Sequence, residues 1–202
     1  MATKKKAFSK ETALSTSAHL SAHLAPDLKT LAQVVKEIRQ EGKTISLTQG
    51  VWDLIHEGHA KYLALAKQQC DVLVVGVDSD ALTKLRKGPS RPIVPEQERL
   101  NMLAHLRHTD ILFLRSPRHG MDITNKLIQT VKPDILVLSK TTGDLSPKQV
   151  RALKKFAKKI VYLDPQSSTS TTARIRLLSI DGAKELSKKV TALLDDFVEA
   201  KK

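Results

Sequence analysis

The sequence predicts an α/β protein, a Rossmann-like three-layer sandwich with a mainly parallel sheet. Short apolar segments typical of strands alternate with helical segments from Gly42 to Leu163. Aromatic residues make up only 3% of the chain, so the core must consist of aliphatic side chains, as suits helices packed on a parallel sheet. With 202 residues, the chain can form one full core but not two ordinary domains once its tails are removed.

The chain divides into three expected parts. Residues 1–25 are polar and lack a sustained apolar period, which predicts a flexible N-terminal arm. Residues 26–178 carry the alternating pattern and form the expected domain. Residues 179–202 form the third part, a C-terminal helix that is amphipathic from Ala183 to Val198.

The elements of the domain follow one another in a regular order. Pro26-Asp27 marks the start of an amphipathic helix that ends at Gly42. Strands are predicted over residues 43–48, 71–77, 111–114, 135–138 and 160–163. Helices are predicted over residues 59–69, 81–87, 96–106, 123–131 and 147–158. Strands joined through helices imply right-handed crossovers and therefore parallel pairing.

The charge and the cysteine content limit the possible partners and compartment. A net charge of +13 would attract nucleotides, nucleic acid or an anionic membrane, and much of it lies in lysine runs that suit a solvated surface. Cys70 is the single cysteine and cannot form an internal disulfide. The sequence shows no signal peptide and no membrane span. We therefore expect a cytoplasmic protein that does not contact membranes.

The first strand-to-helix turn, Thr48–His59, carries the clearest chemical signal. Ligands of open parallel sheets bind beyond the carboxyl ends of the strands. Gly50 allows backbone to approach a phosphate closely, and the helix that starts near Gly58 directs free amides and its positive dipole end to the same place. His56 and His59 are three residues apart and can both face the phosphates. The turn therefore predicts a phosphate site.

Three other motifs do not fit. The turn lacks the three spaced glycines of the dinucleotide fingerprint. Gly42-Lys43-Thr44 has Glu37 where a Walker loop needs glycine, and it precedes a strand instead of following one. A zinc-protease motif would need a second histidine at the position of Ala60. We expect no metal-ligating side chains.

The turn also resembles a known family. The pattern Gly50-x-x-Asp53-x-x-His56-x-Gly58-His59 is the signature of cytidylyltransferase-like nucleotidyltransferases, and the resemblance extends over residues 28–177. Segments 41–45, 78–80 and 86–92 look most like the adenylyltransferase domain of ADP-heptose synthase. The resemblance implies transfer of AMP from ATP to a sugar 1-phosphate with release of pyrophosphate. It also implies Mg²⁺ bound mainly through the nucleotide phosphates, and a homodimer.

The resemblance assigns roles to residues. His56 and His59 would hold the triphosphate and stabilise charge, and Lys87 matches a family lysine near the phosphates. Asp53 and Arg91 would lie on the substrate side, although Asp53 also suits a residue that fixes the turn. The implied nucleotide-binding positions are Gly50, Val51, Trp52, Gly58, Arg99, Ser170, Thr171, Thr172 and Arg174.

Some details of the resemblance stay open. Either Ser170–Thr172 or Thr171–Ala173 aligns with the family's Ser/Thr triplet, which makes Arg174 and Arg176 alternatives. Trp52 replaces the usual Phe, and the loop from Leu138 to Asp144 departs from the Lys-Gly-Gly-Asp type of the heptose enzymes. Because that loop helps to define both pockets, CTP with glycerol 3-phosphate, phosphocholine or a similar alcohol phosphate is the second candidate.

A nucleic-acid-binding protein on a degenerate enzyme scaffold would also explain the charge. Two observations disfavour it: the signature histidines are intact, and no aromatic stacking platform is visible. We therefore expect the partners to be a nucleoside triphosphate and a small phosphorylated substrate.

Overall fold

The computed structural model describes residues 23–120, 122–140, 147–167 and 171–199. The chain divides into two units, residues 1–166 and 167–202, and we describe each by itself. In the second unit, helix α9 (Thr171–Glu199) passes without a break through the boundary that we predicted at residues 178 and 179. Its exposed apolar side chains are Leu177, Leu178, Ile180, Leu186 and Val190.

The first unit is built on a parallel sheet, which confirms the predicted fold class. In the described part of the chain the sheet has six strands in the order β1-β4-β3-β2-β5-β6, and every pair is parallel. The strands are β1 (Leu24–Ala25), β2 (Ile45–Gly50), β3 (Val72–Asp78), β4 (Ile111–Arg115), β5 (Ile135–Ser139) and β6 (Lys159–Leu163). The chain adds β3 and β4 on one side of β2, then β5 and β6 on the other. This reversal creates a crevice at the carboxyl end of β2, where ligands bind in such sheets.

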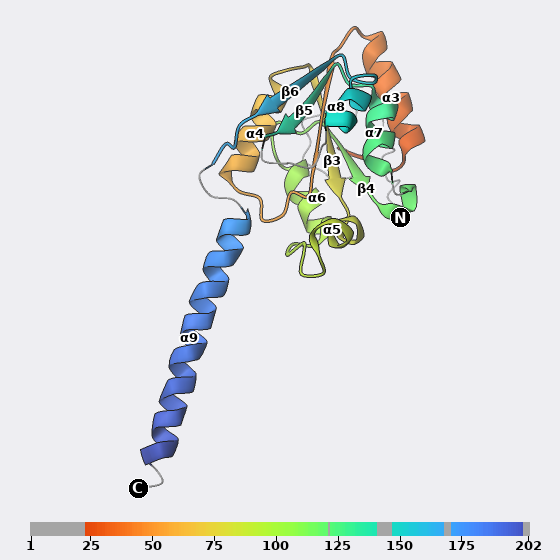
Figure 1. Cartoon of the computed structure of the whole chain (residues 1–202). Helices are drawn as coiled ribbons and strands as arrows, with labels where there is room; N and C mark the ends of the chain where they lie inside the picture. The colour runs from red at the N-terminus through yellow and green to blue at the C-terminus, as the bar shows by residue number, and fades with distance from the viewer. Residues whose placement is uncertain (1–22, 121, 141–146, 168–170, 200–202) are drawn as a thin grey trace, which may run out of the picture. The chain divides into compact units, whose positions relative to one another are not determined.

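Helices cover both faces of the sheet (Figure 1). Their bounds are α3 (Leu28–Gln40), α4 (Glu57–Lys67), α5 (Asp80–Lys87), α6 (Glu96–Ala104), α7 (Ile123–Val131) and α8 (Pro147–Leu153), with a short 3₁₀ helix η1 (Pro117–His119). Side chains of α3, α7 and α8 pack into one hydrophobic core, and side chains of α4 and α6 pack into a second. The sheet therefore lies between two helical layers, as predicted.

Strand β3 shows why the sequence folds this way. All seven of its residues are buried. Val72 and Val74 belong to the core beneath α3 and α7, whereas Leu73, Val75 and Val77 belong to the core beneath α4 and α6. Because successive side chains of a strand point to opposite faces, a strand covered on both faces is apolar on both, and in β3 only the last residue, Asp78, is charged.

Strand β1 is an element that sequence reasoning missed. Leu24 pairs with Leu112 and Ala25 pairs with Phe113, and Ala25 is only 2% exposed. His23 Nδ1 lies 3.0 Å from the carbonyl oxygen of Asp110. The sheet therefore begins two residues before the domain boundary that we placed at residue 26. The rest of the predicted arm, residues 1–22, lies outside the described residues.

The helices also differ from membrane-spanning segments. Within the ranges that the structure describes, none of them has both the length and the apolar character needed to cross a membrane.

Candidate active site

The turn between β2 and α4 wraps around a buried tryptophan. Trp52 is 6% exposed, has a φ of 59°, and donates a hydrogen bond from Nε1 to the Gly76 carbonyl oxygen at 3.0 Å. A Cβ atom at Gly50 would lie 3.2 Å from Trp52 Cε2. Glycine at position 50 therefore lets the backbone lie directly on the indole.

The two signature histidines cap helix α4 through reciprocal hydrogen bonds. His56 is the N-cap residue, and its Nδ1 accepts a hydrogen bond from the Gly58 N–H at 3.1 Å. His59 Nδ1 accepts from the His56 N–H at 3.3 Å. The ring centroids of His56 and His59 are 4.1 Å apart. Because a backbone N–H only donates, both Nδ1 atoms are acceptors, and each neutral imidazole carries its proton on Nε2.

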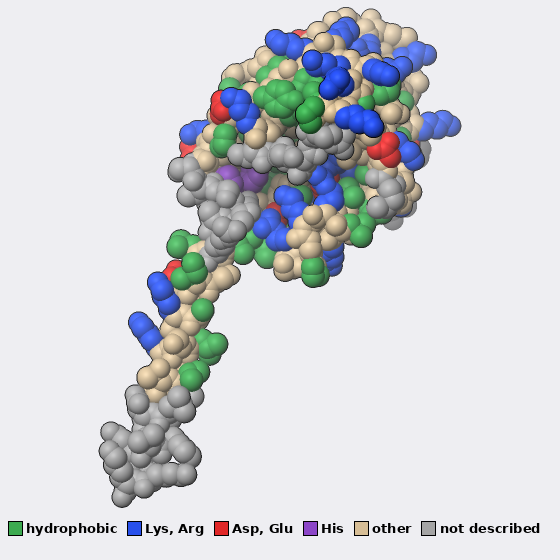
Figure 2. Space-filling view, viewed as in Figure 1, with side chains coloured by type: hydrophobic (Ala, Val, Ile, Leu, Met, Phe, Trp, Pro, Cys, Tyr) green, Lys and Arg blue, Asp and Glu red, His purple; other side chains and the backbone are tan. Residues whose placement is uncertain are grey.

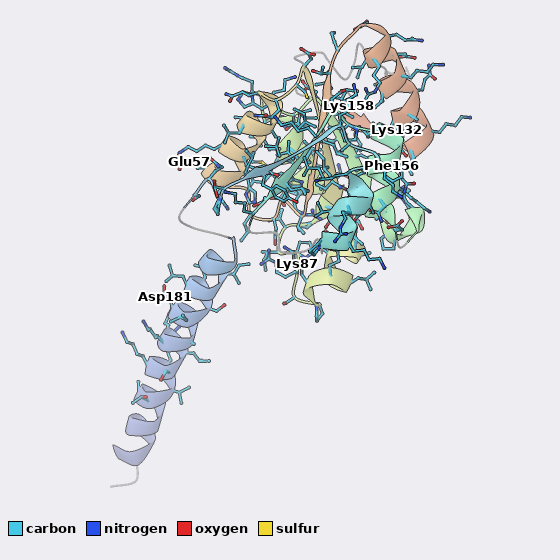
Figure 3. All side chains as sticks on the ribbon, turned by 45° about the horizontal axis from the view of Figure 1, so that its top comes forward. Glu57, Lys87, Lys132, Phe156, Lys158 and Asp181 are labelled. Atoms are coloured by element: carbon cyan, nitrogen blue, oxygen red, sulfur yellow. The ribbon has the colours of Figure 1, made fainter. Side chains whose placement is uncertain are left out.

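This capping arrangement places groups that favour anions at the start of α4. Two Nε2–H donors lie at the N-terminus of α4, where the positive end of the helix dipole also favours anions. Glu57, the acidic residue of this first turn, is exposed and pairs with Lys61 at 2.5 Å (Figure 3). The hydrogen bond from Lys61 lowers the pKa of Glu57. The carboxylate beside the histidines is therefore already paired with a cation.

The hydroxyl of Tyr62 contacts both β2 and β5. Its hydroxyl is 3.0 Å from Thr48 Oγ1 and donates to the Val137 carbonyl oxygen at 3.3 Å. Burial raises the pKa of Tyr62 to about 12, although the hydrogen bond with Thr48 opposes this shift. The hydroxyl thus stays neutral in neutral solution and joins the two strands that border the site.

Asp53 and Arg91, both predicted on the substrate side, contact each other. Asp53 is 2% exposed and forms an ion pair with Arg91 at 2.9 Å. Its carboxylate also accepts hydrogen bonds from the Ile93 and Val94 N–H groups, each at 2.9 Å. Asp53 therefore fixes the turn by holding it against the segment after α5. This segment is distant in sequence, whereas the sequence suggested a contact within the turn itself.

Arg99, predicted to bind the nucleotide, is only 1% exposed. It donates to the carbonyl oxygens of Val51 and Asp78, the latter at 2.8 Å, and to that of Val94 at 2.9 Å. It also forms an ion pair with Asp80 at 2.7 Å. These contacts give Arg99 a positioning role, because they hold the backbone of the turn at Val51.

Lys87 lies in the last turn of α5, and its side chain is exposed (Figure 3). On the face seen in Figure 2, histidine side chains lie beside a hollow that is also bordered by Lys and Arg side chains. A recess with this charge suits a polyphosphate ligand.

The Ser/Thr-rich segment falls largely outside the described residues. This applies to Ser170 and to the side chains of Thr171, Thr172 and Arg174, whose backbone begins α9. Residues 141–146 of the loop after β5 are likewise outside them. The roles predicted for these positions stay predictions.

A polar cluster around the ends of β3 and β4, in which Asp78 and Arg115 are buried, was not predicted. The Asp78 cluster consists of Asp78, Arg86, Arg115 and Gln49, and Asp78 is 0% exposed. Its only signal in the sequence is a single arginine at the end of the apolar strand Ile111–Arg115. Such an arginine looks like an ordinary surface cation in the sequence, and only the structure shows that it is buried.

The acidic side chains around the site are engaged by cations. Among the residues with described positions, no group of three or more His, Cys, Asp and Glu side chains could hold a metal ion. The carboxylates of Asp53, Asp78 and Asp80 are each paired with an arginine.

Known proteins are similar in sequence to most of this chain. The cytidylyltransferase-like family model matches residues 47–186. The chain is 38% identical over 152 residues to the bifunctional protein HldE of a Nitratiruptor species, covering 74% of this chain and 31% of that protein. It is 37% identical over 147 residues to HldE of Syntrophotalea carbinolica, covering 71% and 29%. The chain thus spans about a third of the length of these relatives.

Solved structures agree with this family. A lipopolysaccharide core biosynthesis protein from Thermoplasma volcanium is 30% identical with a TM-score of 0.52, covering 60% of this chain and 97% of that one. Pantothenate synthetase from Thermus thermophilus is 12% identical with a TM-score of 0.54, covering 70% and 61%, and supports the fold alone. Together with the His56 and His59 geometry, these matches show that the chain belongs to the cytidylyltransferase-like family of nucleotidyltransferases.

Proposed function

We propose that this protein transfers AMP from ATP to a sugar 1-phosphate and releases pyrophosphate. The observation that carries the proposal is the pair of Nε2–H donors that His56 and His59 present at the start of α4. The choice of ATP and a sugar 1-phosphate rests on the resemblance to the adenylyltransferase domain of ADP-heptose synthase. Similarity to the HldE proteins over more than 70% of this chain supports that choice.

The reaction needs no covalent nucleophile from the protein. An oxygen of the substrate phosphate attacks the α-phosphorus of ATP, a new P–O bond forms, and the bond from the α-phosphorus to the bridging oxygen breaks. Pyrophosphate leaves with that electron pair. His56 and His59 donate hydrogen bonds to phosphoryl oxygens as negative charge shifts toward the leaving group. Lys87 adds a positive charge, while the anchored turn holds the reactants in line.

We propose that Mg²⁺ supplies further charge neutralisation, bound mainly through the nucleotide phosphates. The donor set supports this mode, since the nearby carboxylates of Asp53, Asp78 and Asp80 are paired with arginines. Mg²⁺ keeps several of its waters and needs few protein ligands when phosphates are present.

The proposal is tested by measuring pyrophosphate release with each of the four nucleoside triphosphates against a panel of sugar 1-phosphates and alcohol phosphates. We expect the fastest turnover with ATP and a sugar 1-phosphate, and loss of turnover when a chelator removes Mg²⁺. Faster turnover with CTP and glycerol 3-phosphate or phosphocholine would establish the second candidate instead. Tight binding to RNA or DNA without any pyrophosphate release would favour the nucleic-acid-binding alternative.

We also propose that the protein acts in the cytoplasm as a homodimer, which the family resemblance supports. Light scattering at several protein concentrations would measure its mass in solution. A mass of one chain at all concentrations would contradict the dimer.

A further inference from the structure

In the Asp78 cluster, one side-chain donor at the end of β2 has no hydrogen-bond partner among the described residues. Arg115 is 2% exposed, donates to Asp78, and donates from one guanidinium nitrogen to Gln49 Oε1 at 2.5 Å and to Thr124 Oγ1 at 3.0 Å. The side-chain oxygen of Gln49 is therefore committed to the arginine. Its amide nitrogen has no hydrogen-bond partner in the described part of the chain. The orientation follows because an arginine N–H needs an acceptor.

A glycine in the intervening strand makes this contact possible. The strand order is β4-β3-β2, so the side chain of Arg115 must cross β3 to reach Gln49. Gly76 is the β3 residue that pairs with Gln49. A Cβ atom at Gly76 would lie 3.1 Å from Arg115 Cδ and 3.1 Å from Gln49 Cγ. The missing side chain is thus the space through which the arginine passes.

Two arginines of the cluster share the carboxylate of Asp78. Arg86 forms an ion pair with Asp78 at 2.7 Å, while Arg115 binds the other carboxylate oxygen. The Nε atom of Arg115 is buried and has no partner among the described residues, which makes the cluster costly for folding. The buried guanidinium of Arg115 polarises the amide that it binds, and a polarised N–H donor favours an anionic acceptor, such as a phosphoryl oxygen.

Gln49 and the histidines approach the end of β2 from different faces of the sheet. Thr48 contacts Tyr62 of α4, whereas Gln49 lies on the opposite face, near Leu127 of α7. Gln49 immediately precedes Gly50, the first residue of the signature. A ligand that lies across the end of β2 would therefore meet the histidines on one side and the amide on the other.

We propose that the Gln49 side-chain amide donates a hydrogen bond to a phosphoryl oxygen of the bound ligand, and that Arg115 is the positioning residue that orients it. This inference rests on the proposed function, since it assumes a phosphorylated ligand in the same site. The phosphoryl oxygen belongs either to ATP or to the sugar 1-phosphate, and the two ligands are tested separately.

The test compares Gln49→Leu with the parent by calorimetric titration with a non-hydrolysable ATP analogue and Mg²⁺, and by KM and kcat for the sugar 1-phosphate of highest turnover. We expect a loss of about tenfold in affinity for one of the two ligands, the effect of one hydrogen bond to a charged group. A rise in the Kd of the ATP analogue places the contact on ATP. A rise in the KM of the sugar phosphate with little change in kcat places it on the acceptor.

Control variants separate binding from folding. Gln33→Leu removes an exposed glutamine amide on α3 that contacts Glu37, and it should leave both affinities unchanged. Arg115→Met should weaken the same ligand as Gln49→Leu, and the double variant should be no weaker than Arg115→Met alone, since Arg115 acts through Gln49. If Arg115→Met does not fold, Gln49→Leu still decides the question, because Gln49 is only half-buried.

The outcomes distinguish the two proposals. If folded Gln49→Leu binds both ligands within twofold of the parent, the inference is wrong and the proposed function stands. If the parent binds the ATP analogue but turns over no phosphorylated substrate, the proposed function fails, and the Kd values still decide the role of Gln49. If the parent binds neither ATP nor any sugar phosphate, both proposals are overturned.

Discussion

The imidazole rings of His56 and His59 each cap helix α4 and each carry the N–H group that we propose binds phosphate. In each imidazole, Nδ1 accepts a hydrogen bond from the backbone at the start of α4, and the proton lies on Nε2. Protonating Nδ1 would abolish that acceptor and with it the cap. The helix terminus therefore selects the tautomer that can donate to phosphate.

Substitution can separate these two roles. His59→Ala should lower turnover by about 10²- to 10³-fold, since it removes one donor to the transition state. Its effect on stability should be smaller, about 0.5–2 kcal/mol, because only a capping contact is lost. Pyrophosphate release at saturating substrate and thermal unfolding measure the two effects.

His56→Asn provides the matched control. Asparagine is a good N-cap residue but lacks the Nε2–H donor. His56→Asn should unfold close to the parent temperature but turn over much more slowly than the parent. His56→Ala should unfold at a lower temperature and also turn over slowly. Parent-like turnover in both folded variants would remove the catalytic role from this signature.

Tyr62 predicts a stability change in alkaline solution. Burial raises its pKa to about 12 from the ordinary value of 10.0, so the folded state holds the phenolic proton more tightly than the unfolded state. The resulting stability is fully present below pH 10 and is lost as the pH rises through 12. Denaturant unfolding at several pH values should show this decline, on the order of 2 to 3 kcal/mol. Tyr62→Phe, which has no phenolic proton, should lack this part of the decline.

The sequence predicted some site residues and missed others, depending on whether their surroundings are local or distant in sequence. Spacing and glycine positions were sufficient to locate His56 and His59, because they describe a local turn. Arg99 and Arg115 depend on burial by distant segments, and a cation in the sequence looks the same whether it is buried or solvated. Their contacts with backbone carbonyls and with Asp78 could therefore be seen only in the structure.

Among the elements, strand β3 controls whether the Asp78 cluster can form. Gly76→Ala would place a Cβ atom 2.9 Å from Leu127 Cδ2 and 3.1 Å from Arg115 Cδ. We expect a loss of stability of about 1–3 kcal/mol from overpacking, together with the same ligand defect as Gln49→Leu. Thermal unfolding and ligand titration would measure both.

Gly182→Ala is the matched control for that substitution. Gly182 lies within α9, and a Cβ atom there would meet nothing within 4 Å. Alanine should therefore leave ligand affinity unchanged and favour the helix by roughly 1 kcal/mol. If Gly76→Ala were as harmless as Gly182→Ala, the close passage of Arg115 across β3 would be contradicted.

Most elements long enough to show a period were predicted to within two residues, but the helix predicted over residues 147–158 ends at Leu153. The predicted strands differ from β2 to β6 by one or two residues at their ends, and the helix predicted over Ile123–Val131 has the same bounds in the structure. Strand β1 is two residues long, which is too short to show any alternation. Its existence depends on pairing with β4, which is remote in sequence.

For the whole molecule, strand β1 determines where the chain can be shortened. Removing residues 1–22 leaves the pairing of Leu24 and Ala25 with β4 intact, whereas removing residues 1–25 exposes the backbone of Leu112 and Phe113. We expect the longer deletion to melt at a lower temperature and to aggregate, because an open apolar edge strand pairs with other chains. The shorter deletion should keep parent turnover. Equal melting and solubility of the two deletions would show that β1 contributes nothing to the sheet.

Trp52 also gives the protein a natural optical probe. It is the single tryptophan of the chain, and its ring lies edge-on to His59 at a centroid distance of 5.7 Å. All indole fluorescence therefore comes from the turn that we propose binds the phosphates. A ligand that hydrogen-bonds to His59 changes the electrostatic field on the indole, so adding ATP should shift or quench the emission. Nucleotide binding could then be followed in unlabelled protein, and His59→Ala should remove much of the signal.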